Sequence, residues 1–357
     1  MHEIQEFSRE LTYAEAVNDA LSTAMALDPL MICYGLGISD PKAIFGTTKN
    51  LAETYGSNRV FDTPTSENAM TGVSIGAAIG GVRSVVTHQR LDFFLLAMDQ
   101  LVNSAAKWHY TYGVSVPITI RLIIGRGWGQ GPTHSQNLHS WFAHIPGLKV
   151  VMPSTSQDAK GLMLSSIFDP NPVVFLEHRW LHNSRGMVPF NDFRTPLGSA
   201  NIITNGKDIT IIGMSYLTVE ARRATDYLAE FNISCELIDL RSLKPIDWTL
   251  IENSIKKTGC LLVLDSGYAT GSLAGEIVAK VAMDSFQYLK SAPARLAMPD
   301  VPEPSSFGLT KDFYIGAKQI VEQVCKMLGI VDKEILCGSP VQQVPHDVPG
   351  EWFKGPF

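Results

Sequence analysis

The sequence predicts an α/β protein with two doubly wound domains, each built on a parallel sheet. Its 357 residues are enough for two domains or one large one. Short apolar runs alternate with segments of helical periodicity along most of the chain. Each of these runs is unbroken by polar residues, which is typical of strands buried between two layers of helices.

The composition is that of a globular protein from a reducing compartment. Hydrophobic residues make up 45% of the chain and the net charge is -6, so a sizeable core is possible and nucleic-acid binding gains no support. The five cysteines are scattered without metal-ligand spacing. The first residues have neither a signal-peptide nor a transit-peptide pattern, and no apolar run approaches the roughly 18 residues of a membrane span. We therefore expect a cytoplasmic protein with no membrane segment.

The first domain is predicted to cover residues 1–190. Thr12 is expected to cap a helix that runs to about Leu27, because apolar residues recur there at helical spacing. A later helix, capped by Ser154, is expected to end near Phe168. The other main elements expected are strands at 30–35, 59–61, 83–87, 117–124, 148–152 and 173–177 and a long helix at 92–112.

Periodicity is lost between Trp180 and Asn205, where Pro, Gly and Asn gather, and a linker is predicted at 191–206. The second domain, 207–335, repeats the alternation, and 336–357 form a proline-rich tail that we expect to run over the surface or a neighbouring subunit. The elements expected in the second domain are strands at 209–213, 234–239, 260–265 and 293–298 and helices at 216–231, 247–257, 270–284 and 313–328.

The stretch 62–72 carries the first candidate for chemistry. Pro64 disfavours helix at the residue before it, and Ser66 is expected to cap the helix that follows. Glu67 then lies in the first helical turn, where the helix dipole favours a carboxylate. The small residues behind it would let another backbone or a flat ligand approach closely. The alternative is an ordinary helix-start carboxylate with no further role.

A glycine-dense loop at 125–136 carries the second candidate, His134. The loop follows a predicted strand, and open α/β sheets bind their ligands at the carboxyl ends of strands. The glycines do not form a G-x-G-x-x-G fingerprint, because Gln130 occupies the last glycine position, and they do not form a P-loop. The alternative is a structural histidine.

Two aromatic residues, Phe93 and Phe94, open the long helix predicted after the third strand. Aromatic residues at helical spacing usually belong to the core, so neither ring alone indicates a function. The polar residues before them could line a cleft or form a solvated loop; they are His88, Gln89 and Arg90.

Taken together with other segments of the chain, these candidate regions resemble a known family. The sequence is similar to the β subunit of the first, decarboxylating component of 2-oxo acid dehydrogenases (pyruvate dehydrogenase-like), a branch of the transketolase-like thiamine diphosphate enzymes. The similarity extends over about residues 10–330. The segments that carry it are 59–67, 72–78, 97–107, 134–136, 146–151, 158–162, 171–173, 237–245 and 300–302.

The resemblance implies roles for the three candidates. Glu67 matches the glutamate that hydrogen-bonds the aminopyrimidine ring of thiamine diphosphate, and Phe93 matches the aromatic side chain packed against that ring. His134 matches the active-site histidine near the substrate carboxylate, with an acid–base or electrostatic role. The first domain would then be pyrimidine-binding and the second transketolase C-terminal-like.

The resemblance also implies a partner and two metal ions. The family binds the cofactor diphosphate through Mg²⁺ with a Gly-Asp-Gly motif, which this sequence lacks. An α-type subunit is therefore expected to supply the diphosphate half of each site, in an α₂β₂ heterotetramer. The family often carries a structural potassium ion held by backbone carbonyls, and the matching positions are Ile118, Ser166, Ile167, Asp169 and Asn171.

The sequence departs from the family pattern around the expected substrate. Leu36 and Gly37 replace an acidic pair, the run 88–92 replaces an aromatic and Thr-containing segment, and Leu96 replaces a glutamine. These departures indicate an atypical donor or acceptor.

Three functions remain open from the sequence. The first is a subunit that decarboxylates a 2-oxo acid and passes the acyl unit to a lipoyl group. The second is the C-terminal half of a split transketolase or an acyloin-forming carboligase, a transferase that uses a ketose or 2-oxo acid donor and an aldehyde acceptor. A regulatory subunit without catalysis is the third, and the joint presence of Glu67, Phe93 and His134 argues against it.

Overall fold

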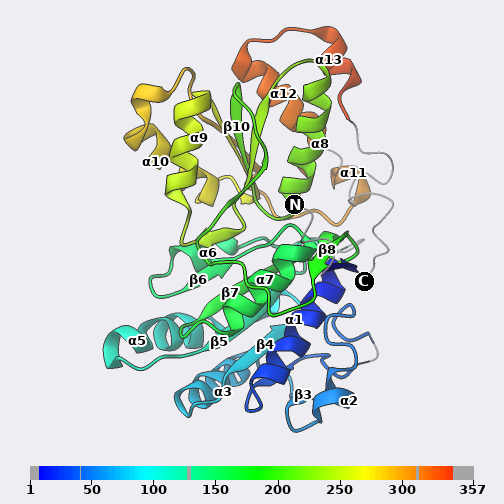
Figure 1. The fold of residues 1–357 in the computed structure, drawn as a ribbon, viewed down its shortest axis with the longest axis vertical. Coiled ribbons are helices and arrows are strands. Elements are labelled where there is room, and N and C mark those ends of the chain that lie inside the picture. The colour runs from blue at the N-terminus through cyan, green and yellow to red at the C-terminus, as the bar shows by residue number, and fades with distance from the viewer. Residues whose placement is uncertain (1–7, 41, 127–129, 311–312, 341–357) are drawn as a thin grey trace. The chain divides into compact units, whose positions relative to one another are not determined.

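The computed structural model describes residues 8–40, 42–126, 130–310 and 313–340 (Figure 1). The chain forms two compact units. The first comprises Met1–Gly125 and Thr133–Leu197, and the second comprises Arg126–Pro132 and Gly198–Phe357. Among the described residues, no helix is both long enough and apolar enough to cross a membrane.

The first unit alternates strands and helices. Its strands are β1 (Ser8–Thr12), β2 (Ile32–Gly35), β3 (Val60–Asp62), β4 (Ser84–His88), β5 (Ile118–Ile124), β6 (Lys149–Val151), β7 (Val173–His178) and β8 (Arg185–Pro189). Its helices are α1 (Tyr13–Leu27), α2 (Leu51–Tyr55), α3 (Glu67–Ile79), α4 (Leu91–Phe94), α5 (Ala106–Tyr112), α6 (His139–His144) and α7 (Ser156–Ile167), with 3₁₀ turns at Leu95–Ala97 and Arg179–Leu181 and a π-helical segment at Gln100–Ala105.

The strands of this unit form a parallel sheet in the order β6-β7-β5-β4-β2-β3. The chain passes from β2 to β3 on one side and then crosses β2 to reach β4 on the other, so the strand order reverses beside β2. Open α/β sheets bind ligands at the carboxyl ends of strands next to such a reversal. A separate antiparallel pair joins β1 to β8.

Different helices cover the two faces of this sheet. Helices α1 and α7 pack side by side (Figure 1), and Tyr13 at the start of α1 has its ring centroid 5.8 Å from that of His182. On the other face, Ser74 of α3 bonds Ser84 of β4 at 2.6 Å, and His88 meets the ring of Phe94 in α4 edge-on. The sheet therefore separates an α1/α7 face from an α3/α4 face.

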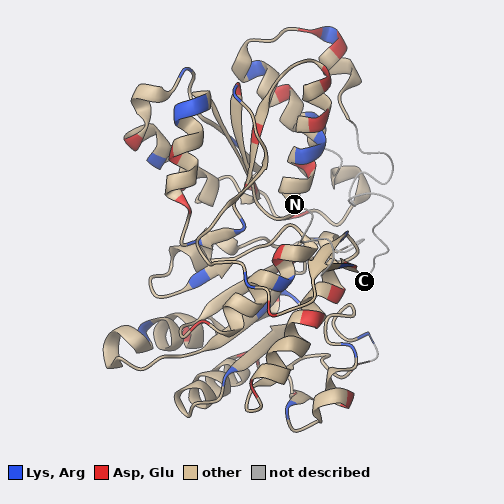
Figure 2. Ribbon diagram, viewed as in Figure 1, with Lys and Arg blue, Asp and Glu red and all other residues tan. Residues whose placement is uncertain are grey.

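The second unit has a mostly parallel sheet in the order β14-β13-β10-β11-β9, with β9 antiparallel to β11. Figure 2 shows acidic and basic residues close together along its helix α8, in agreement with the ion pair between Arg222 and Asp226. Its elements are β9 (Asn201–Thr204), β10 (Ile209–Gly213), α8 (Tyr216–Glu230), β11 (Cys235–Asp239), β12 (Ser242–Lys244), α9 (Trp248–Thr258), β13 (Leu261–Tyr268), α10 (Leu273–Asp284), a 3₁₀ turn at Phe286–Tyr288, β14 (Ala294–Met298), α11 (Phe307–Thr310), α12 (Ala317–Leu328) and α13 (Lys333–Gly338).

The predicted fold class, two α/β domains with mostly parallel sheets, is confirmed. Two local predictions are wrong. Thr155, not Ser154, caps α7, because its hydroxyl accepts the Asp158 N–H at 3.1 Å. Ser66 holds the N-cap position of α3 without a side-chain capping bond.

The long helix expected at 92–112 is present but is not a single regular α-helix. The chain there is helical throughout, but the 3₁₀ turn and the π-helical segment divide it into α4 and α5. Such changes of helical pitch rotate the side chains of α4 relative to those of α5. The predicted tail beyond residue 340 lies outside the described residues.

Candidate active site

Helix α3 begins with Glu67, whose side chain is buried although the residues just before it are exposed. Two hydrogen bonds attach this helix to the sheet. The Tyr34 hydroxyl of β2 donates to the Met70 carbonyl at 2.7 Å, and Ser74 bonds Ser84. Burial raises the pKa of Tyr34 to about 12, so its hydroxyl keeps the proton that it donates. The sheet thus fixes the position of α3, the helix that begins with Glu67.

Asp62, at the carboxyl end of β3, organises the loop beside this helix. Its carboxylate accepts the backbone N–H groups of Ile38 at 2.7 Å and Ser39 at 2.9 Å, as well as the Ser39 hydroxyl. Burial acts to raise the pKa of Asp62, but these hydrogen bonds hold it below its usual value. The carboxyl ends of β2 and β3 are thereby tied together.

The structure brings two of the predicted residues into contact. The rings of Phe93 and His134 meet edge-to-face with centroids 5.3 Å apart. Nδ1 of His134 shares a hydrogen bond of 3.0 Å with the Thr133 hydroxyl, which leaves Nε2 as the nitrogen available to a ligand. Helix α4, which carries Phe93, packs against α3, the helix that begins with Glu67.

A second link joins α4 to the loop that carries His134. Oδ1 of Asp92 accepts the Gln136 side-chain amide at 2.8 Å and, more weakly, its backbone N–H at 3.4 Å. Asp92 directly precedes Phe93, and Gln136 lies two residues after His134. Sequence reasoning did not single out this pair; the signal was that Asp92 belongs to the run where the sequence departs from its family.

The start of the glycine-dense loop is fixed by two features. Gly125 has φ +81°, and a Cβ there would lie 2.5 Å from the His178 ring, so a larger residue would be both strained and crowded. The Arg90 guanidinium donates to the Gly125 carbonyl at 2.8 Å. Arg90 is buried, so the solvated-loop alternative is wrong for this residue, while residues 127–129 lie outside the described part of the chain.

Several buried polar atoms near this loop have no hydrogen-bond partner among the described residues. They are both ring nitrogens of His88, Oδ2 of Asp92, the Ser135 hydroxyl and Oδ1 of Asn137. Burial lowers the pKa of His88 to about 4, so its ring is neutral at pH 7. Buried polar groups nearly always find a partner, so these atoms at the carboxyl ends of β4 and β5 are candidates to contact a polar ligand.

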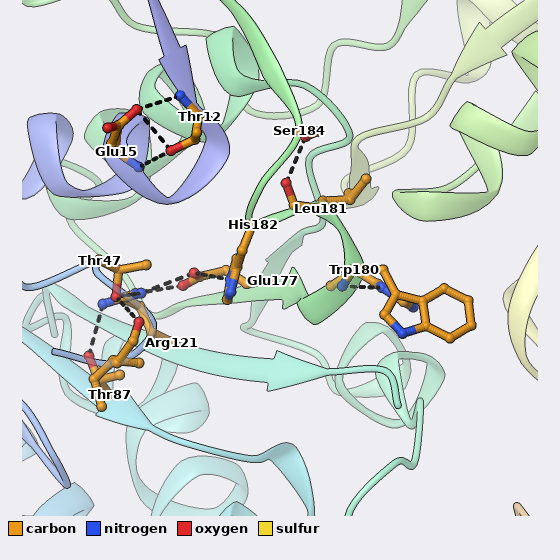
Figure 3. Close-up of polar contacts among 12 residues, drawn as sticks. Thr12, Glu15, Thr47, Thr87, Arg121, Glu177, Trp180, Leu181, His182 and Ser184 are labelled. Carbon is orange, nitrogen blue, oxygen red and sulfur yellow. Dashed lines mark hydrogen bonds and ion pairs between the residues drawn. The ribbon is translucent and has the colours of Figure 1, made fainter. Parts of the chain in front are cut away.

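The α1/α7 face carries a buried charged network instead (Figure 3). The Arg121 guanidinium donates twice to Glu177, at 2.6 and 3.0 Å, and also to the hydroxyls of Thr47 and Thr87. His182 bonds the same carboxylate at 3.3 Å. Burial acts to raise the pKa of Glu177, but the Arg121 charge brings it down to about 2.

The five positions predicted for potassium lie at the amino edge of the sheet, away from the candidates above. Ile118 begins β5, and the segment 166–171 leads into β7. The Arg83 guanidinium already donates to the carbonyls of Ile167 at 2.6 Å and Asp169 at 3.2 Å. Each carbonyl oxygen has two lone pairs, so a cation there would share these two with Arg83.

Two side chains add to the polar character of that turn. Lys149 pairs with the Asp169 carboxylate, and Oδ1 of Asn171 is buried without a hydrogen-bond partner among the described residues. The turn therefore retains acceptors for a cation. Within the described ranges, no group of three or more His, Cys, Asp and Glu side chains is arranged to hold a metal ion.

Comparisons with known proteins identify both units. Residues 9–184 match the family model of the transketolase pyrimidine-binding domain, and residues 198–320 match that of the transketolase C-terminal domain. A solved structure titled split gene transketolase, inactive beta4 tetramer, has a TM-score of 0.73 at 19% identity and covers 90% of this chain and 99% of that one. At that identity the similarity shows a shared fold.

Sequence relatives narrow the family further. The mitochondrial pyruvate dehydrogenase E1 component subunit beta-1 of Oryza sativa subsp. japonica is 38% identical over 310 residues, covering 85% of this chain and 83% of that protein. The beta subunit of acetoin:2,6-dichlorophenolindophenol oxidoreductase of Cupriavidus necator is 37% identical over 334 residues, covering 90% of this chain and 98% of its own. The chain therefore belongs to the transketolase-like family, within the branch of β subunits of thiamine diphosphate-dependent 2-oxo acid dehydrogenases.

Proposed function

We propose that this chain supplies the aminopyrimidine half of a thiamine diphosphate site and works with an α-type subunit that binds the diphosphate through Mg²⁺. The assembly we propose is α₂β₂. Two observations support it: the relatives named above are β subunits, and this sequence has no Gly-Asp-Gly motif.

The observation that carries this proposal is the state of Glu67. Its side chain is only 7% exposed, and none of the described residues donates a hydrogen bond to it. Its carboxylate oxygens are not among the fully buried atoms without a partner, so they remain accessible to a donor at a helix start where negative charge is favoured. An N–H group of an aminopyrimidine ring, entering beside α3, would supply the missing donor.

The other two residues take complementary roles. Bound thiamine diphosphate supplies a nucleophilic carbon that adds to a carbonyl and then stabilises the electron pair left when a carbon–carbon bond breaks. Phe93 presents its ring as a flat apolar surface for the pyrimidine. His134, oriented by Thr133 and Phe93, offers Nε2 to hold or move a proton at the substrate oxygen.

Calorimetric titration of thiamine diphosphate with Mg²⁺ tests the shared site. We expect tight binding only when the chain is mixed with its α-type subunit. Tight binding by the chain alone would mean a complete diphosphate site in this chain and would overturn the division between subunits.

Replacing Glu67 tests the chemistry in the reconstituted complex. Glu67→Gln is expected to lower kcat by about 100-fold or more, because proton transfer through a positioned group contributes that much. Glu53→Gln is the matched control, since Glu53 also lies in a first helical turn but is exposed. Undiminished turnover by Glu67→Gln would indicate a regulatory subunit instead.

The second candidate function is transfer of the two-carbon unit to an aldehyde, as in a split transketolase or an acyloin-forming carboligase. The observation that favours it is the unpartnered carboxylate oxygen of Asp92, which suits a hydroxylated substrate. Steady-state assays with a lipoylated carrier protein against an aldose phosphate separate it from the dehydrogenase function.

We also propose a structural potassium ion at the carbonyls of Ile118, Ser166, Ile167, Asp169 and Asn171. The unpartnered Oδ1 of Asn171 supports it. Thermal unfolding in KCl should then occur at a higher temperature than in choline chloride at equal ionic strength. Identical transitions in the two salts would contradict this site.

For the compartment we propose the cytoplasm. The relative from Oryza sativa is named as mitochondrial and that from Cupriavidus necator is not. Fractionation of the source cells would test this.

A further inference from the structure

We infer that Asp92 is a specificity-determining residue that accepts a hydrogen bond from a hydroxyl of the donor substrate. The inference rests on the proposed function and names its substrate class. The donor would be hydroxylated on the carbon next to the carbonyl, as in hydroxypyruvate or a ketose.

The first step is the position of Asp92. It immediately precedes Phe93, and its Oδ1 is bonded by Gln136 on the loop that carries His134. The contact between Phe93 and His134 joins the same two segments, α4 and the loop. Asp92 is therefore held by the two segments that present the proposed cofactor and substrate contacts.

The second step is its free oxygen. Oδ2 of Asp92 is buried and has no hydrogen-bond partner among the described residues. A carboxylate oxygen accepts hydrogen bonds and does not donate them when ionised. Burying such an acceptor without a hydrogen bond costs free energy, so a donor group is expected to approach it in the working enzyme.

The third step is which donor fits. A methyl group, as in pyruvate, offers no hydrogen-bond donor, and a substrate carboxylate would be repelled by the like charge. A hydroxyl group donates directly to the oxygen. Sites that bond a substrate hydroxyl discriminate strongly against the analogue that lacks it, so the geometry points to the hydroxylated donor.

Two donors that differ in one hydroxyl test the inference directly. Hydroxypyruvate and pyruvate both lose CO₂ by cleavage of the C1–C2 bond. Water then releases the two-carbon acid, glycolate or acetate, and dichlorophenolindophenol takes the two electrons and two protons that this oxidation sets free. The complex reconstituted with its α-type subunit is assayed with each donor. The quantity compared is the ratio of kcat/KM for hydroxypyruvate to that for pyruvate.

We expect this ratio to exceed one in the natural protein and to fall about tenfold or more in Asp92→Leu, since hydrogen bonds to charged groups are among the stronger ones. Asp92→Asn keeps an oxygen for Gln136 and replaces Oδ2 by an uncharged amide nitrogen, so an intermediate ratio is expected. Asp99→Asn is the control, because Asp99 is exposed and, among the residues that the structure describes, bonds only Asn103.

The result distinguishes recognition from positioning. If Asp92 merely holds Gln136 and the His134 loop, both substitutions lower kcat/KM for the two donors by the same factor. The ratio then stays constant, which overturns the inference. A ratio below one in the natural protein overturns it as well.

The same assay separates this inference from the proposed function. A complex that binds thiamine diphosphate and turns over pyruvate but not hydroxypyruvate refutes the substrate class alone. A complex that binds the cofactor and turns over neither donor also refutes the substrate class. Failure to bind thiamine diphosphate in the presence of the α-type subunit refutes the proposed function itself.

Discussion

The two faces of the first sheet treat buried polar groups in opposite ways. On the α1/α7 face, Arg121 and Glu177 are fully buried and bonded to each other and to neighbouring side chains. On the α3/α4 face, His88 and Asp92 keep buried atoms for which the described residues provide no partner. Both faces belong to the same strands, so burial alone does not tell structural charge from functional charge.

The two faces differ in which groups supply hydrogen bonds to the buried polar atoms. The Arg121–Glu177 pair is bonded by the chain's own residues and serves the fold, although Nδ1 of the adjacent His182 has no partner among the described residues. Polar atoms left without partners at the carboxyl ends of strands are available to a ligand. Substitutions on each face should therefore differ in kind: loss of stability on one, and changed activity or increased stability on the other.

The largest effect is expected from breaking the network on the α1/α7 face. Arg121→Met leaves the Glu177 carboxylate buried without its main partner, and removing one member of a buried ion pair costs about 3–5 kcal/mol. Urea unfolding of the chain, followed by circular dichroism, measures the loss.

A double substitution provides the control for this experiment. Arg121→Met with Glu177→Leu removes both charges, and replacing a whole buried pair by apolar residues is often nearly neutral. If Arg121→Met alone has a stability within about 1 kcal/mol of the natural chain, the network is not the structural feature that we take it to be.

Acid should destabilise the fold through three buried histidines, which include members of both faces. Burial lowers the pKa of His88 to about 4, of His178 to about 3 and of His182 to about 4. In the unfolded chain these rings protonate near pH 6.5, whereas in the folded chain they stay neutral. The unfolded state thus binds more protons as the pH falls below 6.5, and stability must decrease there.

The measurement is the unfolding free energy between pH 7.5 and 5. Each such histidine contributes a slope of up to about 1.4 kcal/mol per pH unit. Glu177, whose folded pKa is near 2, adds a further loss only below pH 4.5. A flat profile from pH 7.5 to 5 would mean that these rings are accessible to protons in the folded state.

These comparisons also show what could be predicted from sequence. The fold class followed from apolar runs that had to be buried on both sides, and Thr12 was recognised as a helix cap from the helical periodicity after it. In the structure Glu15 completes a capping box with Thr12. Glu67 and His134 were found through patterns local to one segment. The contact between Phe93 and His134 joins two segments, and the family resemblance placed both residues in one site.

Most of the features that the sequence did not predict depend on contacts between distant parts of the chain. Strand β8 pairs with β1, more than 170 residues away, and no local pattern encodes that partnership. The link from Asp92 to Gln136 spans 44 residues. The helix cap is a local case: Ser154 and Thr155 are both good capping residues, and the residue at which the helical backbone begins decides which of them caps α7.

A smaller effect of opposite sign is expected on the α3/α4 face. In the natural chain the ring centroids of His88 and Phe94 are 4.9 Å apart. The substitution His88→Phe keeps this edge-on packing and removes two unpartnered nitrogens. Because an unsatisfied buried group costs about 1–3 kcal/mol, we expect a stability gain of about 1 kcal/mol. Urea unfolding measures the gain, and a clear loss of stability would mean that a bound water or another group satisfies the ring.

The smallest effect should come from a polar pair that is satisfied but exposed, at the start of α1. The Thr12 hydroxyl accepts the Glu15 N–H at 3.1 Å while the Glu15 carboxylate accepts the Thr12 N–H at 2.8 Å. Thr12→Ala removes one of these bonds and should cost about 1 kcal/mol, as for other helix caps.

This cap also has a pH dependence with a known sign. The Thr12 backbone N–H and the Thr12 hydroxyl, which donates to the Glu15 carboxylate at 3.0 Å, both hold the pKa of Glu15 below its usual value. The contribution of these bonds to stability is present above pH 4.5 and is lost as the pH falls below it, and Thr12→Ala removes only the hydroxyl's part. Unfolding of Thr12→Ala and the natural chain at pH 7 and pH 3.5 should therefore differ less at the lower pH. A constant difference would mean that the hydroxyl stabilises the helix only by accepting the Glu15 N–H. A cost equal to that of Arg121→Met would remove the distinction between exposed and buried polar pairs on which the comparison of the two faces rests.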